Sequence, residues 1–100
     1  MKLKDYAFIV LGPEYDSAKD TAVLASPIFK TTVTGVGSIE EACLAAKRVV
    51  QGGAQLIELC GGFDEAAMSR VIEAIDGSVP VGRVHFTGDE KEKLEAFLGE

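Results

Sequence analysis

Metal-binding residues are scarce in this sequence. It has one histidine and two cysteines among its 100 residues, and the cysteines form no CxxC pair. Because zinc sites draw most of their ligands from Cys and His at short spacings, we expect no metal site. A disulfide between Cys43 and Cys60 is not expected either, since the chain shows no sign of secretion.

Long apolar runs and basic clusters are also missing. No stretch approaches the ~20 apolar residues of a membrane span, and the apolar run near the start lacks the cleavage site of a signal peptide. Ten Lys and Arg stand against 16 Asp and Glu, which gives an acidic protein of net charge −6. A nucleic-acid binder needs a basic face. We therefore expect a cytoplasmic protein with no nucleic-acid or membrane partner.

The overall composition is that of an ordinary globular protein. Hydrophobic residues make up 47% and charged residues 26% of the 100 residues, which indicates one folded domain spanning residues 1–100. A domain this small buries a limited fraction of its surface and folds with a modest margin. Self-association is therefore expected.

Helical and extended patterns alternate along the chain. Residues 6–11 read YAFIVL, a continuous apolar run typical of a central strand. Short loops joining strand to helix to strand favour parallel strands with right-handed crossovers. We predict a single small α/β domain of about four mainly parallel strands, with helices after strands 2, 3 and 4, as an open doubly wound or half-barrel-like sheet. The other strands are expected at 29–36, 56–60 and 79–86, and the helices at about 38–51, 64–76 and 89–98.

Two helix starts carry recognisable caps. Ser38 is an expected helix cap because Glu41 follows it by three residues. Asp89 is expected to cap the last helix. The inner face of that helix would carry Leu94, Phe97 and Leu98.

The segment before the second predicted strand allows two interpretations. Asp16 could cap a helix that stops before Pro27, whereas TAVLAS could form a short strand. The structure of residues 14–27 stays open at this point. In residues 29–36, alternation gives one apolar face and one polar face. The apolar face carries Phe29, Thr31 and Val33, and the polar face Lys30, Thr32 and Thr34.

Glycine occurs in every loop expected at the carboxyl end of a strand, where α/β sheets and barrels bind ligands. Glycine there allows either close approach of the backbone to a ligand or a tight turn. GVGSIE lacks the third glycine of a dinucleotide fingerprint, but its helix start carries no leading carboxylate and could hold a phosphate. The candidate binding residues in these loops are Gly12, Gly37, Ser38, Gly61 and Gly62.

The stretch LIELCGGF places a carboxylate and a thiol in an otherwise apolar strand. Alternation puts Glu58 and Cys60 on one face, and it puts Arg83 and His85 on one face of the next strand. If the two strands are neighbours with aligned ends, Glu58 lies near Arg83 and Cys60 lies near His85. Thr32 and Thr34 could extend the same polar face.

Three interpretations fit this cluster. A buried Glu58–Arg83 ion pair would offset the cost of burying either charge alone. A ligand site would use the same two residues as clamps. A cysteine enzyme would use Cys60, at a glycine turn before a helix, as nucleophile and His85 as base.

The sheet topology determines how the polar face is covered. With all crossovers on one side the face would be bare, like the inner wall of a half barrel, and a second copy would cover it. We therefore predict a homodimer or higher oligomer. In a doubly wound sheet, helices would cover both faces and confine the cluster to the strand ends.

The chain also shows two resemblances to known proteins. Residues 46–63, AKRVVQGGAQLIELCGGF, resemble a βα unit of phosphate-binding (β/α)₈ barrels, which implies that Glu58 faces an interior. Gly53-Ala54 before the strand also fits that resemblance, although a whole barrel needs ~250 residues. Across YAFIVLGPEYD, SPIFKTTVTGV, IELCGGF and VPVGRV the chain resembles a family of short prokaryotic proteins of unknown function, which implies no activity.

The functional prediction follows from the location of the glycine loops. We predict that the protein binds a small molecule at the carboxyl ends of its strands. A cysteine-dependent enzyme using Cys60 and His85, and a structural or assembly protein without a catalytic site, are the alternatives. The sequence specifies no ligand, cofactor or reaction.

Overall fold

Five strands form one mixed sheet in the computed structural model, which describes residues 2–99. The spatial order is β2-β3-β1-β4-β5, with β2 antiparallel to β3 and every other neighbouring pair parallel. The predicted α/β class with a mainly parallel sheet is confirmed. The strands are β1 (Asp5–Leu11), β2 (Thr21–Ala25), β3 (Lys30–Val36), β4 (Leu56–Leu59) and β5 (Val81–Arg83).

Strand β2 lies in the segment, residues 14–27, for which the sequence allowed either a helix or a strand. The helix alternative for residues 14–27 is wrong, and TAVLA forms an edge strand instead. A tight turn joins it to β3, in which the Ser26 amide donates to the Phe29 carbonyl oxygen at 2.8 Å. The Ser26 hydroxyl also accepts from the Phe29 amide at 3.1 Å. This local hydrogen bonding fixes a hairpin, which leaves no room for a helix between β1 and β3.

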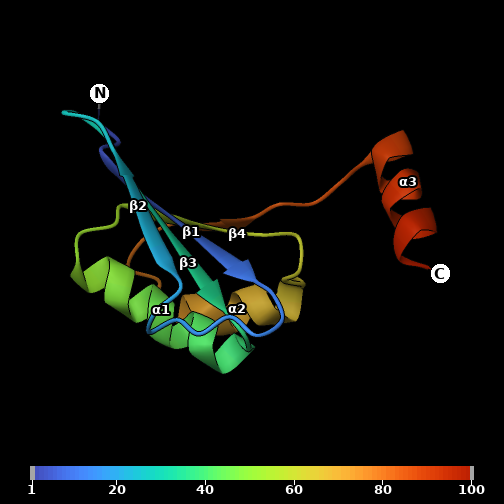
Figure 1. Ribbon diagram of the computed structural model, residues 1–100, viewed down its shortest axis with the longest axis horizontal. Coiled ribbons are helices and arrows are strands. Elements are labelled where there is room, and N and C mark those ends of the chain that lie inside the picture. The colour runs from blue at the N-terminus through green and yellow to red at the C-terminus, as the bar shows by residue number, and fades with distance from the viewer. Residues whose placement is uncertain (1, 100) are drawn as a thin grey trace.

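Two helices cover a single face of the sheet (Figure 1). Helix α1 (Ile39–Gln51) links β3 to β4, and α2 (Glu65–Ala74) links β4 to β5. Both connections step in the same direction along the sheet, so right-handed crossovers place both helices on the same side. The helices are therefore arranged as in the half-barrel-like alternative, and the doubly wound alternative is wrong.

Side-chain caps begin both of these helices. The Ser38 hydroxyl accepts from the Glu41 amide at 3.1 Å, as predicted, and Asp64 accepts from the Ala67 amide at 2.8 Å. Helix α3 (Gly88–Leu98) differs because its N-cap is Thr87, which makes no side-chain cap bond. The expectation that Asp89 caps this helix is wrong, since Asp89 already lies in its first turn.

The core lies between the sheet and the two covering helices. Helix α1 turns three small residues, Ala42, Ala45 and Ala46, toward the sheet, and each is at most 1% exposed. Small side chains there let the helix backbone approach the strands closely. The larger members of the core are Ile9, Val36, Ile57, Leu59, Phe63 and Val71.

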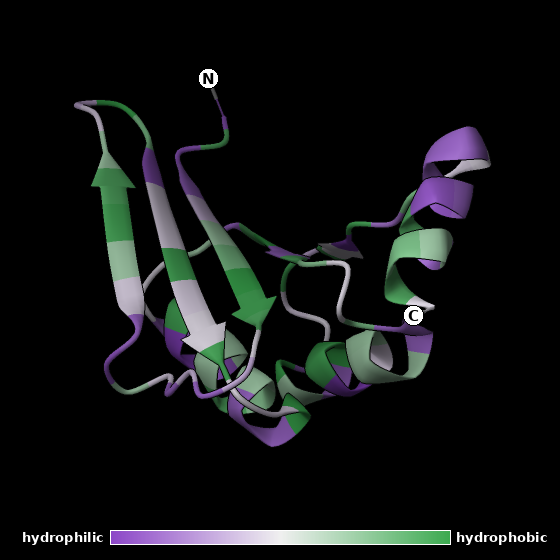
Figure 2. Cartoon of the chain, turned by 45° about the vertical axis from the view of Figure 1, so that its right-hand side comes forward, coloured by the Kyte–Doolittle hydropathy of each residue, from purple (hydrophilic) through white to green (hydrophobic). Residues whose placement is uncertain are grey.

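Within residues 2–99, the opposite side of the sheet carries no helix, and we name it the open face. Strands β1 and β2 are apolar along most of their length (Figure 2). Register and alternation place a single charged residue, Glu58, among the strand positions of this face. The open face consists of Tyr6, Phe8, Val10, Ala22, Leu24, Thr31, Val33, Gly35, Leu56, Glu58 and Gly82.

The more polar face of β3 is therefore the one that the helices cover, and its more apolar face belongs to the open face. Thr32 pairs with Ala7 and Thr34 with Ile9, so both threonines lie on the helix-covered side. Thr34 is only 3% exposed there. The expectation that these threonines share a face with Glu58 is wrong.

Helix α3 stands apart from the layer formed by α1 and α2 in both views (Figures 1 and 2). It contains no buried residue, and Phe97 and Leu98 are 76% and 68% exposed. The predicted inner face is thus not packed against this chain's own sheet. Residues 84–87, which belong to no helix or strand, carry α3 beyond the β5 edge. Within residues 2–99, no helix is long and apolar enough to cross a bilayer.

Candidate functional site

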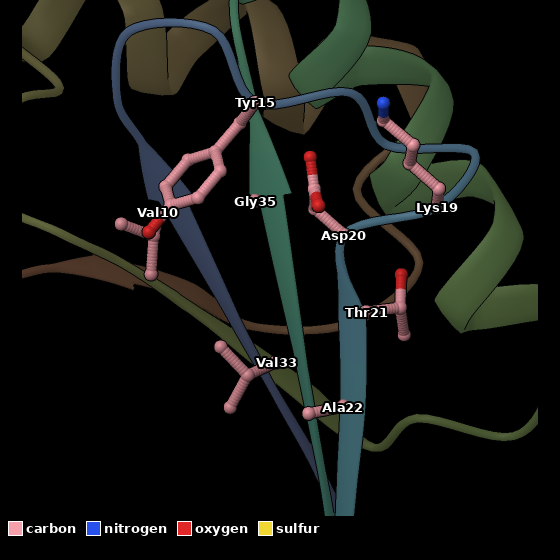
Figure 3. Close-up of a pocket in the computed structure, with 8 residues that line it drawn as sticks. All are labelled: Val10, Tyr15, Lys19, Asp20, Thr21, Ala22, Val33 and Gly35. Atoms are coloured by element: carbon pink, nitrogen blue, oxygen red, sulfur yellow. The ribbon is translucent and has the colours of Figure 1, made fainter.

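A hollow of about 290 Å³ lies at the carboxyl ends of β1 and β3, and we call it the Tyr15 hollow (Figure 3). Its floor belongs to the open face and is formed by Val10, Ala22, Val33 and Gly35. The aromatic ring of Tyr15 stands beside Val10, and polar side chains line the opposite wall (Figure 3). These polar residues are Lys19, Asp20 and Thr21, from the end of the β1–β2 loop and the start of β2.

Glycines at the carboxyl ends of β1 and β3 make room for Tyr15. A β carbon at Gly35 would lie 2.7 Å from the Tyr15 Cγ, and one at Gly12 would lie 2.9 Å from its Cε2. A β carbon at Gly37 would lie 2.7 Å from the Tyr15 carbonyl oxygen. Contacts this short are not tolerated, so any larger residue would displace the ring or its backbone. Gly12 and Gly37, two of the predicted binding residues, lie against Tyr15.

Hydrogen bonds fix the part of the loop that follows Tyr15. The Asp16 amide donates to the Asp20 carboxylate at 2.7 Å, and the Gly35 amide donates to the Asp20 carbonyl oxygen at 2.8 Å. The Arg48 guanidinium, from α1, donates to the Ser17 carbonyl oxygen at 3.1 Å. Ser17 is buried. The walls of the hollow are therefore held in place before any ligand arrives.

Three groups remain available to a ligand in this hollow. Within residues 2–99 the Lys19 ammonium has no ion-pair partner, and the Tyr15 hydroxyl makes no hydrogen bond to the protein. The Tyr15 residue is 43% exposed, so one side of its ring is open for stacking. A cation, a hydroxyl donor and an aromatic face beside an apolar floor can hold a small acid with an apolar part.

At the Ser38 helix start, the Gly37 and Glu41 amides already donate to side chains of the protein. The Glu41 carboxylate accepts from the Gly37 amide at 3.2 Å and from the Ser17 amide at 3.1 Å. A carboxylate thus already occupies the position in which an anion would gain from the helix N-terminus.

Glu58 and Arg83 do not form the predicted buried ion pair. Strands β4 and β5 are neighbours, as expected, but Glu58 pairs with Gly82 and Arg83 pairs with Leu59. A difference of one residue in register moves every side chain to the other face. Glu58 is exposed on the open face and accepts a hydrogen bond from the Tyr6 hydroxyl at 2.6 Å. The helix-free side of a (β/α)₈ barrel strand faces the barrel interior, so Glu58 lies on the side that the barrel resemblance implied, although here that side is exposed.

The Tyr6–Glu58 contact has a measurable signature. Burial of the phenol, then the hydrogen bond to Glu58 and its negative charge, raise the pKa of Tyr6 from 10.0 to about 12. Because ionised Tyr6 is disfavoured in the fold, its contribution to stability is complete below pH 10 and is lost as the pH rises toward 12. Ultraviolet titration of the two tyrosines should therefore show one late step.

Replacing each tyrosine by phenylalanine identifies the residue that gives the late step. In Tyr6→Phe we expect the late step to disappear and the free energy of unfolding at neutral pH to fall by about 1 kcal/mol. Tyr15→Phe should keep the late step. A late step that persists in Tyr6→Phe would contradict the contact.

Cys60 and His85 are not assembled into a nucleophile and base. The Cys60 thiol sulfur accepts from the Leu11 amide at 3.2 Å, where β1 and β4 end side by side. Extending the β4–β5 register brings Val84 rather than His85 opposite Cys60. No hydrogen bond joins Cys60 to His85 in the part of the chain that the structure describes, residues 2–99. In the same residues, no three His, Cys, Asp or Glu side chains lie close enough to hold a metal ion.

A second, smaller hollow of about 170 Å³ gathers three of the predicted residues between the end of β5 and α3. Gly61, Arg83 and His85 line it. Gly62 lies outside it, and a β carbon there would approach the Cys60 sulfur at 3.5 Å. The hollow depends on the position of α3, which has no buried residue to hold it. The remaining lining residues are Val84, Phe86, Lys91, Leu94 and Glu95.

Sequence reasoning missed the residues that build the Tyr15 hollow. They lie mostly in the segment whose structure was left open between helix and strand. A usable signal was present in three glycines at the ends of β1 and β3, Gly12, Gly35 and Gly37. Glycines that clear space in two adjacent loops indicate a bulky neighbour, here Tyr15.

The fold and the site together define a class of protein. It is a small α/β domain whose sheet is covered by helices on one side and which has a hollow at its strand ends. Within that class, the chain belongs to a family of unknown function (DUF6506), which it matches over residues 4–99. No curated protein and no solved structure matches the chain.

Proposed function

We propose that the protein binds a small organic acid in the Tyr15 hollow. The observation that supports this proposal is the Tyr15 ring, held over space cleared by Gly12 and Gly35 beside an apolar floor. Small-molecule sites combine an apolar lining with a few fixed polar groups, and α/β sheets place such sites at the carboxyl ends of their strands. We also propose that the protein is cytoplasmic.

The chemistry of the lining favours an aromatic or aliphatic carboxylate. Stacking on Tyr15 and contact with Val10 and Val33 would hold the apolar part. The Lys19 ammonium would pair with the carboxylate, while Asp20 next to it would disfavour a ligand carrying more negative charge. A hollow this open suits weak, reversible binding at millimolar to micromolar concentration.

Benzoate is a suitable probe for this site. Titration of isotopically labelled protein with benzoate, followed by nuclear magnetic resonance, should shift the amide signals of Tyr15, Lys19 and Gly35 in a saturable way. Gly35→Ala should weaken binding at least tenfold, because its β carbon would meet the ring at 2.7 Å. A tenfold change corresponds to about 1.4 kcal/mol of binding free energy.

Gly82→Ala is the matched control for this substitution. Gly82 also lies in a strand and on the open face, but a β carbon there would meet no atom within 4 Å. We expect its benzoate affinity to equal that of the parent protein. Shifts centred on Arg83 and His85, or equal affinity in both glycine variants, would show that the Tyr15 hollow is not the binding site.

A further inference from the structure

We propose that two copies of the chain pair through their open faces and that α3 of each copy packs against the other copy. The proposal does not depend on the ligand of the Tyr15 hollow. It starts from two surfaces of residues 2–99 that find no partner within the chain's own fold, the open face and the side of α3 that carries Phe97 and Leu98.

The open face has the composition of an interface centre. Its strand positions include aromatic and aliphatic side chains from β1, β2, β3 and β4, and its one charge is Glu58. Leu24 in β2 is 77% exposed. Depletion of charge at the centre, with enrichment in Tyr and Phe, distinguishes interfaces from ordinary surface.

Glu58 is compatible with burial in such a pair. One of its carboxylate oxygens already accepts from the Tyr6 hydroxyl at 2.6 Å. Tyr6 in turn stacks on Phe29, with ring centroids 6.4 Å apart. A carboxylate that enters an interface with a hydrogen bond in place avoids part of the desolvation cost of an unpaired charge.

Helix α3 needs a partner in order to be stable. An isolated helix of 11 residues is marginal in water, and α3 contributes no buried residue to its own domain. Leu94 and Leu98 are four residues apart and Phe97 is three from Leu94, so the three form one apolar stripe. That stripe makes α3 suited to pack on an apolar surface beyond its own domain.

The available area points to a second copy that uses both surfaces. Five strands at ~4.8 Å spacing and ~17 Å mean length give an open face of about 400 Å². This area alone is below the ~800 Å² per partner of a stable interface. If each copy also buries the apolar face of its α3, about 17 Å by 10 Å, the buried area rises to about 570 Å² per copy, which is about 1,150 Å² in total and close to the ~1,200 Å² lower limit of specific interfaces. A two-fold pair with exchanged α3 therefore accounts for both surfaces.

Sedimentation and light scattering on the full-length chain test the pairing. We expect a mass twice that of the 10.6 kDa chain at micromolar concentration, with reversible dissociation on dilution. Leu24→Glu on the open face and Phe97→Asp on α3 should each raise the dissociation constant at least 100-fold. Leu44→Glu is the matched control, since Leu44 is 56% exposed on α1, and it should leave the pair intact.

Three results would overturn the proposal. These are a single-chain mass at every concentration up to the millimolar range, a pair that survives both variants, and a pair that Leu44→Glu dissolves equally. If Leu24→Glu fails to fold, Phe97→Asp still decides, because Phe97 is not part of the core. The floor of the Tyr15 hollow belongs to the open face, so pairing would cover part of the hollow. Phe97 does not line the hollow, so benzoate titration of Phe97→Asp measures ligand binding in the absence of the pair and keeps the two outcomes separate.

Exchange of α3 has its own readout. In a pair made from one labelled and one unlabelled copy, isotope-filtered spectra should show contacts between Phe97 of one copy and apolar side chains of the other. Contacts of Phe97 found only within the same copy would overturn the exchange.

Discussion

Replacing Phe63 with alanine is expected to lower the free energy of unfolding by about 3–5 kcal/mol. Phe63 is 1% exposed and is among the largest fully buried side chains. It follows the glycine turn after β4, where its amide donates to the Cys60 carbonyl oxygen at 3.1 Å. Asp64, the N-cap of α2, comes directly after it. The ring therefore fixes the entry of α2 onto the sheet as well as filling the core.

Urea denaturation followed by circular dichroism measures this loss. The total stability of a domain is about 5–15 kcal/mol, so the variant should be partly unfolded without denaturant if the parent lies near the lower limit. Leu44→Ala is the control, because Leu44 is an exposed residue of α1. Its effect should stay within about 0.5 kcal/mol. A loss below about 1 kcal/mol for Phe63→Ala would mean that the ring is not a core residue.

Enlarging the alanine stripe of α1 is expected to produce the second large loss. Ala46 is 0% exposed and faces the sheet. Leucine there adds volume where the helix backbone approaches the strands closely, so α1 must shift or adopt strained rotamers. We expect Ala46→Leu to lower the free energy of unfolding by about 1–3 kcal/mol.

The neighbouring position provides the matched control. Lys47→Leu introduces the same side chain one residue later, on the exposed side of the helix. Its effect on unfolding by urea should be within about 0.5 kcal/mol. If Ala46→Leu instead raises stability, the space between α1 and the sheet is underfilled, and the close approach described for α1 is incorrect.

Local signals in the sequence were sufficient for most elements of the fold. The Ser38 cap with Glu41 located α1, and the continuous apolar run located β1. These features depend on neighbours a few residues away, which a sequence shows directly. The last helix was also found, but its packing was not, because packing depends on where residues 84–87 lead the chain.

The candidate site was harder to predict because it depends on long-range pairing. Whether Glu58 meets Arg83 is decided by a single residue of register between β4 and β5, and alternation alone cannot supply that register. The Tyr15 hollow lies at the carboxyl ends of β1 and β3, the end of the sheet at which the sequence predicted a site. The residues themselves were missed, since Tyr15 is held there by Gly35 of another strand.

The central position of β1 affects how the chain folds while it is being synthesised. Its partners β3 and β4 both follow it along the chain. About 50 residues separate the end of β1 from the end of β4, which a ribosome adds in roughly 2–10 s. During that interval YAFIVL is apolar and unpaired on both edges, which makes it a target for chaperones and for misassociation with other nascent chains. The β2–β3 hairpin shortens the time for which β1 is unpaired on both edges, because the hairpin can cover one edge of β1 before α1 and β4 have been made.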